Sequence, residues 1–259
     1  MAATRPAYLD AALPIAFAHQ GGGLENPENT MVAFDHAVAL GYRYLETDVQ
    51  ATSDGVLLTF HDNTLDRMTD RTGTIAELPW TTVQQATVKG GQPLCLLEDL
   101  FTKHPDVRVN IEPKHDHAVA PLIELIRRHD AVTRVCIGSF SGKRVKQMRK
   151  ALGVGLCTST GPLATLRWVI GAALPTPLGA LIARTAANCY QVPVKQWLVP
   201  VTTRRSIALA HHMHKQVHVW TIDDAAEVER LLDLGVDGIM TDRPTVVREV
   251  FLRRGHWSV

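Results

Sequence analysis

The feature that most constrains this chain is a regular alternation of strand-like and helix-like segments along nearly all of its 259 residues. Short apolar runs such as 15–19, 44–50 and 216–222 each precede a segment with apolar residues at helical spacing, such as 29–41 and 224–235. Counting the strands that precede helices gives about eight units, and that number in roughly 250 residues is typical of a closed barrel. The sequence therefore predicts an α/β fold, a TIM (β/α)8 barrel.

Two stretches interrupt the alternation, although no linker rich in Gly, Pro or Ser divides the chain, and one domain spanning 1–259 is expected. Residues 62–92 are polar and irregular and predict an insertion after the second strand region. Residues 163–183 are apolar but are broken by Pro175 and Pro177, which argues against a membrane span. They predict two short amphipathic pieces, which form either an apolar lip or interfacial anchor beside the barrel mouth or ordinary outer helices with one buried face.

Composition limits the partners and the compartment. Lys plus Arg number 27 against 26 for Asp plus Glu, so the basic excess typical of nucleic-acid-binding proteins is missing. The cysteines have no CxxC spacing and mostly fall in apolar runs, which predicts small core residues in a reducing compartment; they are Cys95, Cys136, Cys157 and Cys189. No signal peptide is evident, so we expect a cytoplasmic protein, with peripheral contact at the inner face of a membrane through 163–183 as an open alternative.

Polar residues stand where the predicted strands end, and a TIM barrel builds its active site at the carboxyl ends of its strands. The residues at these positions are His19, Glu46, Asp48, His61, Glu112, Lys114, Ser139, Trp220 and Asp242. Glu46 and Asp48 are two apart on one strand, so both side chains point to the same face, and Glu112 and Lys114 repeat that spacing. The sequence therefore predicts a mouth that is rich in carboxylates.

Carboxylates that are crowded together repel one another unless a cation neutralises them. Oxygen ligands favour a hard ion, so Glu46, Asp48 and Glu112 predict a site for one divalent cation, Mg²⁺ or Ca²⁺. The alternative is that ordinary salt bridges to Lys114, Arg43 or Arg108 neutralise these side chains. The second strand end, with Glu112, favours the metal.

His19 and His61 both lie where a strand turns into a loop, and two histidines flanking a metal suit acid–base catalysis. Lys114 can place a positive charge beside a phosphate, and the glycines at 21–23 can let backbone N–H groups approach an anion. These glycines lack the patterns of a P-loop and of a dinucleotide-binding fold. Trp220 is expected at the pocket floor, against a glycerol carbon skeleton. Residues 28–29 are expected to cap the first helix and brace the mouth.

Several segments of the sequence together resemble those of the glycerophosphodiester phosphodiesterase family. The matching segments, in order, are AHQGG, PENTMVAF, ETDVQATSDGVLLTFHD, LLEDLF, NIEPK, VWTID and GVDGIMTDRP, from about residue 15 to 248. The resemblance implies a TIM barrel with an insertion at 62–92 and one divalent cation held by Glu46, Asp48 and Glu112. It also implies His19 and His61 as the acid–base pair, and cleavage of glycerophosphodiesters into glycerol 3-phosphate and the head-group alcohol. A free hydroxyl next to the phosphoester could attack phosphorus, giving a cyclic phosphate that water then opens.

One departure concerns the phosphate contacts, for which Lys114, Gln20 and Trp220 are the candidates. The family usually reads His-Arg-Gly where this chain has Gln20, and glutamine cannot replace the charge and the paired donors of arginine. The apolar 163–183 and the HxGGxxENxENT pattern resemble a branch that acts on lysophospholipids, as a lysophospholipase D, or on phosphatidylglycerol, as a phospholipase C. Two other functions stay open: a lipid- or phosphodiester-binding barrel with reduced turnover, and a metal-dependent lyase or aldolase.

Overall fold

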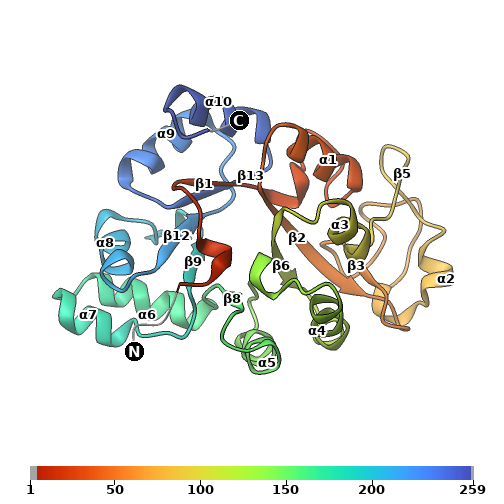
Figure 1. Ribbon diagram of the computed structural model, residues 1–259, viewed down its shortest axis with the longest axis horizontal. Coiled ribbons are helices and arrows are strands. Elements are labelled where there is room, and N and C mark those ends of the chain that lie inside the picture. Colours follow the sequence, from red (N-terminus) through yellow and green to blue (C-terminus); the bar gives the residue numbers. More distant parts are fainter. Residues whose placement is uncertain (1–4, 258–259) are drawn as a thin grey trace.

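A ring of parallel strands organises the computed structural model, which describes residues 5–257 (Figure 1). Its strands are β1 (Ile15–Ala18), β2 (Tyr44–Ala51), β6 (Arg108–Pro113), β7 (Val135–Ile137), β8 (Cys157–Thr158), β9 (Cys189–Val192), β12 (Gln216–Val219) and β13 (Gly238–Thr241). Hydrogen bonds join them in the order β8-β7-β6-β2-β1-β13-β12-β9. A parallel bridge between Ser159 and Cys189 connects the two ends of this order. The eight parallel strands confirm the predicted barrel.

Helices cover the outside of the ring, as Figure 1 shows. They are α1 (Met31–Ala39), α3 (Leu97–Lys103), α4 (Val119–Arg128), α5 (Gly142–Leu152), α6 (Pro162–Ala172), α7 (Thr176–Ile182), α8 (Arg204–His212), α9 (Ala225–Leu234) and α10 (Pro244–Arg253). In α4, Val119, Leu122 and Ile126 are buried at helical spacing, which fixes the face that meets the strands. Asp224 caps the start of α9 through the Glu227 N–H, and Gly235 ends it in the left-handed region.

The amino-terminal end of the barrel is closed by a 3-10 turn at Ala7–Leu9, drawn red within the ring of strands in Figure 1. Tyr8 is fully buried, and its carbonyl accepts a hydrogen bond of 2.7 Å from the Tyr44 hydroxyl at the start of β2. Gln216, at the start of β12, donates its side-chain amide to the Leu9 carbonyl at 3.4 Å. The polar strand ends therefore lie at the opposite, carboxyl-terminal end of the barrel.

The predicted insertion at 62–92 lies to one side of the barrel, drawn in yellow tones (Figure 1). It follows β3 (Leu57–Thr59), which pairs antiparallel with β2, and contains α2 (Trp80–Val83), β4 (Thr87–Val88) and β5 (Gln92–Pro93). It packs around a small apolar cluster of its own, made by Leu58, Phe60, Leu65, Ile75, Val83, Ala86, Val88 and Leu94. This cluster anchors a segment that reads as irregular in the sequence.

The apolar stretch 163–183 forms the two short helices α6 and α7, as predicted. They approach so closely that a Cβ on Gly171 would lie 2.7 Å from the Gly179 carbonyl oxygen. Trp168 of α6 is fully buried and stacks on Tyr190 of β9, with ring centroids 4.3 Å apart. The pair is therefore part of the outer helix layer through one face. None of the helices within residues 5–257 combines the length and the apolar character that crossing a membrane requires.

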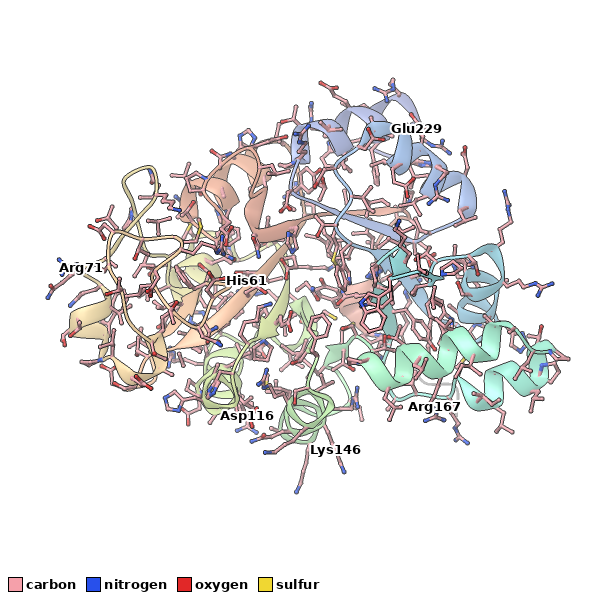
Figure 2. The ribbon with its side chains drawn as sticks, turned by 180° about the vertical axis from the view of Figure 1, so that it is seen from behind. His61, Arg71, Asp116, Lys146, Arg167 and Glu229 are labelled. Carbon is pink, nitrogen blue, oxygen red and sulfur yellow. The ribbon has the colours of Figure 1, made fainter. Side chains whose placement is uncertain are left out.

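The opposite face of α6 and α7 exposes large apolar side chains. They are Leu163, Leu166, Ile170, Leu178 and Leu181, and we call this set the apolar lip. Arg167, which Figure 2 labels on this part of the molecule, donates from Nε to the Ile182 carbonyl and ties α6 to the end of α7.

The expected cap of the first helix is wrong by one or two residues. Thr30 is the N-cap, because its hydroxyl accepts the Ala33 N–H at 3.4 Å. Asn29 instead has a left-handed backbone with φ of 56°, and its side-chain oxygen accepts the Thr47 hydroxyl at 2.7 Å. Residue 29 thus ties the first loop to β2, which agrees with the predicted bracing role.

Candidate active site

The three predicted carboxylates lie on one face of neighbouring strands, with Glu46 and Asp48 within β2 and Glu112 near the carboxyl end of β6. Parallel pairing sets Asp48 opposite Glu112, so both side chains lie on the same face of neighbouring strands. Glu46 is two residues earlier on β2 and shares that face. The exposed fraction is only 5% for Glu46 and 2% for Asp48, so their charge is held away from bulk water.

Lys114 neutralises two of these carboxylates. Its ammonium lies 2.8 Å from Asp48 Oδ1 and 3.1 Å from Glu112 Oε2. Burial opposes its charge, but Asp48 and Glu112 outweigh burial and raise the pKa of Lys114. The salt-bridge alternative is therefore correct for this lysine, whereas Arg108 donates to the Tyr44 hydroxyl at 2.7 Å.

Glu46 is left without such a cation. Within the described chain it has no lysine or arginine at ion-pair distance, and its neighbours are the Gln20 N–H at 3.2 Å and His19 Nε2 at 3.7 Å. Burial, with added repulsion from Asp48 and Glu112, raises the pKa of Glu46 to about 8, and His19 opposes this shift. Without a cation Glu46 is therefore mainly protonated at neutral pH, and a bound cation would favour release of that proton.

The donor set fits a hard divalent cation in its chemistry, because it is built of carboxylate oxygens around an under-neutralised glutamate. The three carboxylates are not drawn tightly together, since their oxygens do not all lie within 4.8 Å of one another in the described chain. The Lys114 ammonium instead holds Asp48 and Glu112. A cation bound by all three acids would have to compete with that lysine.

His19 lies directly after β1, in a short turn at His19–Gly21. Its Nδ1 is 2.7 Å from Asp242 Oδ1, at the end of β13, and its Nε2 faces Glu46. Burial disfavours the charged imidazole, but Glu46 and Asp242 outweigh burial and raise the pKa of His19 to about 9. The arrangement holds a protonated imidazole beside the Asp242 carboxylate at neutral pH.

Gln20 is buried and points at a carboxylate. Its backbone is left-handed, with φ of 51°, and its side-chain amide donates to Asp48 Oδ2 at 2.6 Å. The glycines that follow serve packing, because a Cβ on Gly21 would lie 2.7 Å from the Cβ of Ala33 in α1. Gly22 meets Pro244 of α10 at the same distance. Close approach to helices thus accounts for these glycines without an anion.

His61 lies two residues beyond β3 and is exposed, beside the inserted segment (Figure 2). Its Nδ1 is 2.7 Å from Asp62 Oδ1, which makes a second His–Asp pair. Arg67 of the insertion binds both Asp62 and Glu28 at 2.6 Å. Arg67 first, and His61 next, lower the pKa of Asp62 to about 2, so this aspartate stays ionised.

Two aromatic side chains line the same end of the barrel. Trp220, directly after β12, is half-buried, packs on the barrel interior and faces the Phe140 ring edge-on at 6.3 Å. Phe140 is 66% exposed, and its N–H lies 3.5 Å from Glu112 Oε1. Ser139, also predicted at a strand end, is buried just before it and accepts the Ser141 N–H.

Sequence reasoning placed Asp242 at a strand end but gave it no partner, and it overlooked Asp62, Arg67 and Phe140. An aspartate next to a histidine at a strand end is the signal that marks Asp62. The pairing of Asp242 with His19 spans 223 residues, and only closure of the barrel brings the two together.

Comparisons with known proteins identify the family of the chain. The sequence model of the "Glycerophosphoryl diester phosphodiesterase family" matches residues 19–246. A "Probable glycerophosphodiester phosphodiesterase 2" from Mycobacterium tuberculosis is 39% identical over 245 residues, covering 94% of this chain and 93% of the relative. A human protein named "Lysophospholipase D GDPD1" is 27% identical, covering 89% and 84% respectively.

Solved structures have the same fold. A putative glycerophosphoryl diester phosphodiesterase from Silicibacter pomeroyi has a TM-score of 0.79 at 21% identity, covering 98% of this chain and all of that one. A phosphodiesterase from Oleispira antarctica, in complex with the product sn-glycerol-3-phosphate, has a TM-score of 0.75 at 19% identity, covering 92% and 97%. Because the family model matches most of its length, the chain belongs to the glycerophosphoryl diester phosphodiesterase family, whose members are phosphodiesterase enzymes.

Proposed function

We propose that this enzyme hydrolyses glycerophosphodiesters or lysophospholipids to glycerol 3-phosphate or lysophosphatidic acid plus the head-group alcohol. The observation that supports this most is the under-neutralised Glu46 beside the His19–Asp242 pair at the open end of a family barrel. Phosphorus-31 NMR on glycerophosphocholine, lysophosphatidylcholine and phosphatidylglycerol tests it. Release of glycerol 3-phosphate or lysophosphatidic acid would support the proposal, and no phosphorus product from any of them would contradict it.

The proposed cofactor is one Mg²⁺ or Ca²⁺ held by Glu46, Asp48 and Glu112. When bound, it would supply positive charge that stabilises the phosphoryl oxygens in the transition state. Lys114, already beside two of these acids, would place its ammonium next to the same oxygens. The Gln20 amide donates to Asp48, so it would orient this metal ligand. It would not offer the paired donors to the phosphate that the family arginine implies.

The two histidines divide the proton transfers in this proposal. The Asp242 carboxylate at Nδ1 favours the protonated imidazole, so we assign to His19 the protonation of the leaving head-group oxygen. His61, held by Asp62, accepts the proton of the attacking hydroxyl on the glycerol carbon next to the phosphoester. Water then opens the resulting cyclic phosphate with the two roles reversed, which returns both histidines to their starting states.

Asp242 positions His19 in this scheme, so Asp242→Asn is expected to lower kcat by roughly 10- to 100-fold. Loss of the negative charge also disfavours the imidazolium, so the alkaline limb of the kcat profile should move to lower pH. Steady-state rates across pH check both effects. Asp10→Asn, an exposed residue remote from the mouth, is the matched control, and an unshifted alkaline limb in Asp242→Asn would contradict the positioning role.

A second candidate is a binding barrel with low turnover, and the neutral Gln20 favours it because the site has one cation fewer than the family pattern implies. Tight binding of a diester without product would support this reading. Diacylglycerol released from phosphatidylglycerol would instead assign a phospholipase C.

The apolar lip supports a substrate with an acyl chain and a peripheral contact with lipid surfaces. A cleft of about 630 Å³ begins at Phe140, beside Glu112, and runs along Leu163 at the start of α6. Its walls also include Arg149 and Arg167. Relatives named lysophospholipase D agree with this assignment.

Leu166→Lys combined with Leu181→Lys is expected to lower the rate on micellar lysophosphatidylcholine by roughly tenfold, since two charges disfavour apolar contact. The rate on soluble glycerophosphocholine should stay within about twofold. Leu252→Lys, an exposed leucine on α10, is the control. Point variants are preferred to a deletion of 163–183, because Trp168 anchors α6 in the core and its loss would destabilise the barrel. Equal losses on the two substrates would make α6 and α7 ordinary outer helices.

A further inference from the structure

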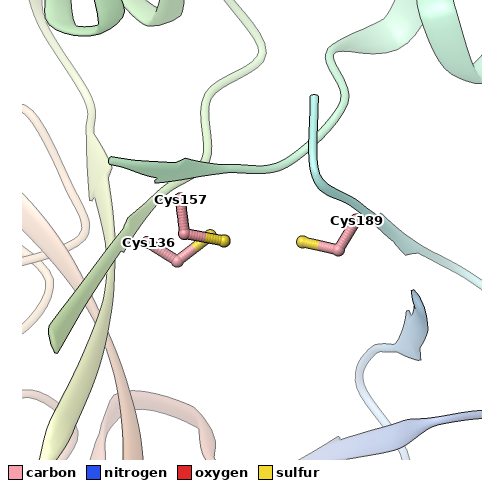
Figure 3. Close-up of side chains that lie close together, drawn as sticks. All are labelled: Cys136, Cys157 and Cys189. Carbon is pink, nitrogen blue, oxygen red and sulfur yellow. The ribbon is translucent and has the colours of Figure 1, made fainter. Parts of the chain in front are cut away.

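Three cysteines meet inside the barrel, below the candidate active site. Cys136, Cys157 and Cys189 come from the successive barrel strands β7, β8 and β9, and their sulfurs all lie within 4.8 Å of one another (Figure 3). Cys136 and Cys157 are register partners in a parallel pair, so both thiols share the inner face. All three residues are fully buried. The strands thus direct three soft donors at one point.

His218 on β12, the next strand of the ring, adds a fourth donor. It is fully buried, and its Nε2 lies 2.9 Å from the Gln216 side-chain oxygen. The Gln216 amide nitrogen donates to the Leu9 carbonyl, so its oxygen is the atom that faces His218. Since that oxygen can only accept, Nε2 carries the proton and Nδ1 is a free acceptor.

The Nδ1 lone pair is one of few buried polar atoms without a partner. Within residues 5–257 these side-chain atoms are Tyr8 Oη, Asn29 Nδ2 and His218 Nδ1. Two of them belong to this region, because Tyr8 packs in one cluster with the three cysteines. In the pairing of β12 with β9, Gln216 lies opposite Cys189, so His218 is two residues farther along and shares the inner face. Its ring lies 4.9 Å from that of Phe17, which packs in the same cluster as the three cysteines. A buried acceptor left unpaired is costly, which points to an absent partner.

We propose that Cys136, Cys157, Cys189 and His218 Nδ1 bind one Zn²⁺ as a structural site in the barrel interior. Three thiolates and one imidazole form a typical closed tetrahedral zinc set, whereas the active-site carboxylates favour Mg²⁺ or Ca²⁺. Gln216 would be the outer partner that holds the imidazole in the ligating tautomer. With four protein ligands no position is left open for catalysis.

The charge and the geometry suit this ion. Zinc–sulfur bonds of about 2.3 Å set tetrahedral sulfurs roughly 3.8 Å apart, so the three sulfurs are already near the required separation. The His218 nitrogen lies outside that set and would have to move toward the sulfurs on binding. Binding releases the remaining thiol protons to solvent and needs no oxidant. The resulting excess negative charge lies near Lys215, whose ammonium donates to the Ala187 carbonyl, two residues before Cys189.

The site also lies where the barrel is least secured. β8 has only two residues, and the isolated Ser159–Cys189 bridge closes the ring between β8 and β9. A metal whose ligands come from β7, β8, β9 and β12 would crosslink the strands on the two sides of this junction. Because the ligands are fully buried, zinc must enter during folding and exchange slowly afterwards.

The experiment uses a chain with Glu46→Gln and Asp48→Asn, so that bound metal cannot be assigned to the carboxylates. The protein is unfolded with reductant and chelator, then refolded with zinc alone. Elemental analysis should find about one zinc per chain, and refolding with Co²⁺ should give a thiolate-to-cobalt charge-transfer band. The zinc-loaded protein should melt several degrees above the metal-free protein.

Cys189→Ser is expected to abolish the charge-transfer band and to lower zinc below a tenth of an equivalent. Cys95→Ser, which removes the remaining cysteine from a different cluster, should leave both unchanged. If Cys189→Ser fails to fold, the zinc content and the cobalt band of the parent chain, with Glu46→Gln and Asp48→Asn alone, decide the test. A folded, reduced parent with less than a tenth of an equivalent of zinc and no charge-transfer band would overturn the proposal. So would a Cys136–Cys157 disulfide in protein isolated under reducing conditions.

Discussion

Replacing His61 with glutamine is expected to lower kcat by roughly 100- to 10,000-fold, the usual contribution of one acid–base group. The His61 side chain is exposed and bonds to its neighbour Asp62, while its backbone bond from Gln50 survives the substitution, so the melting temperature should stay within a few degrees of wild type. Initial rates on glycerophosphocholine and a thermal melt measure the two effects. Loss of rate without loss of stability is the expected signature of a catalytic side chain.

The control for this prediction is His212→Gln, another exposed histidine, at the end of α8 and in no role at the mouth. It should retain full activity. A His61→Gln rate within about twofold of wild type would remove His61 from the mechanism, and His19 would then have to act with water alone.

Neutralising Glu46 is expected to have an effect of similar size. Glu46→Gln keeps an oxygen for the Gln20 N–H but removes the one buried acid of the three that has no lysine or arginine of the described chain beside it. We expect kcat to fall roughly 1,000-fold, since several kcal/mol of charge stabilisation depend on a bound cation. Titration calorimetry with Mg²⁺ and Ca²⁺ should show lost binding in the same variant.

Glu124→Gln is the matched control, because Glu124 is an exposed glutamate on α4. It should bind the cation as the wild type does. Divalent affinity that is unchanged in Glu46→Gln would show that the three carboxylates are not the metal ligands, whatever the activity.

The barrel and the carboxylate-rich mouth could be predicted from the sequence because both follow from local periodicity. A side-chain period of two sets Glu46 and Asp48 on one face, and parallel strands bring their carboxyl ends to one rim. The register that sets Asp48 opposite Glu112 then follows from the pairing of β2 with β6. The fold class was therefore accessible before any coordinates.

The partners of the site residues could not be predicted, because they depend on contacts between distant segments. Nothing in the sequence shows that Asp242 bonds to His19 rather than lying free at the surface. The sequence also leaves open whether Lys114 pairs with the carboxylates or faces a phosphate, and only the structure places it between Asp48 and Glu112. The glycines at 21–23 have a role that the sequence does not reveal. Gly21 is required by the close contact with α1, while the approach of an anion to this turn stays a prediction.

The cysteines show the same limit. Without CxxC spacing they predict ordinary core residues, and all four are indeed buried and free. Only the closing of β7, β8 and β9 into a ring brings three of the sulfurs together. The pairing of β12 with β9 then places His218 on the next strand, on the same face as Cys189. Spacing rules for metal sites apply to ligands on one hairpin or helix, and they have no counterpart for ligands spread over four barrel strands.

The central claim is that Glu46, Asp48 and Glu112 bind one divalent cation on which cleavage depends. Its most direct test is the phosphorus-31 NMR rate of diester cleavage by native protein stripped with chelator, before and after adding Mg²⁺ or Ca²⁺. The account predicts no product in chelator and recovery with one of the two ions, while Glu46→Gln stays inactive. Cleavage at the full rate in chelator would contradict it.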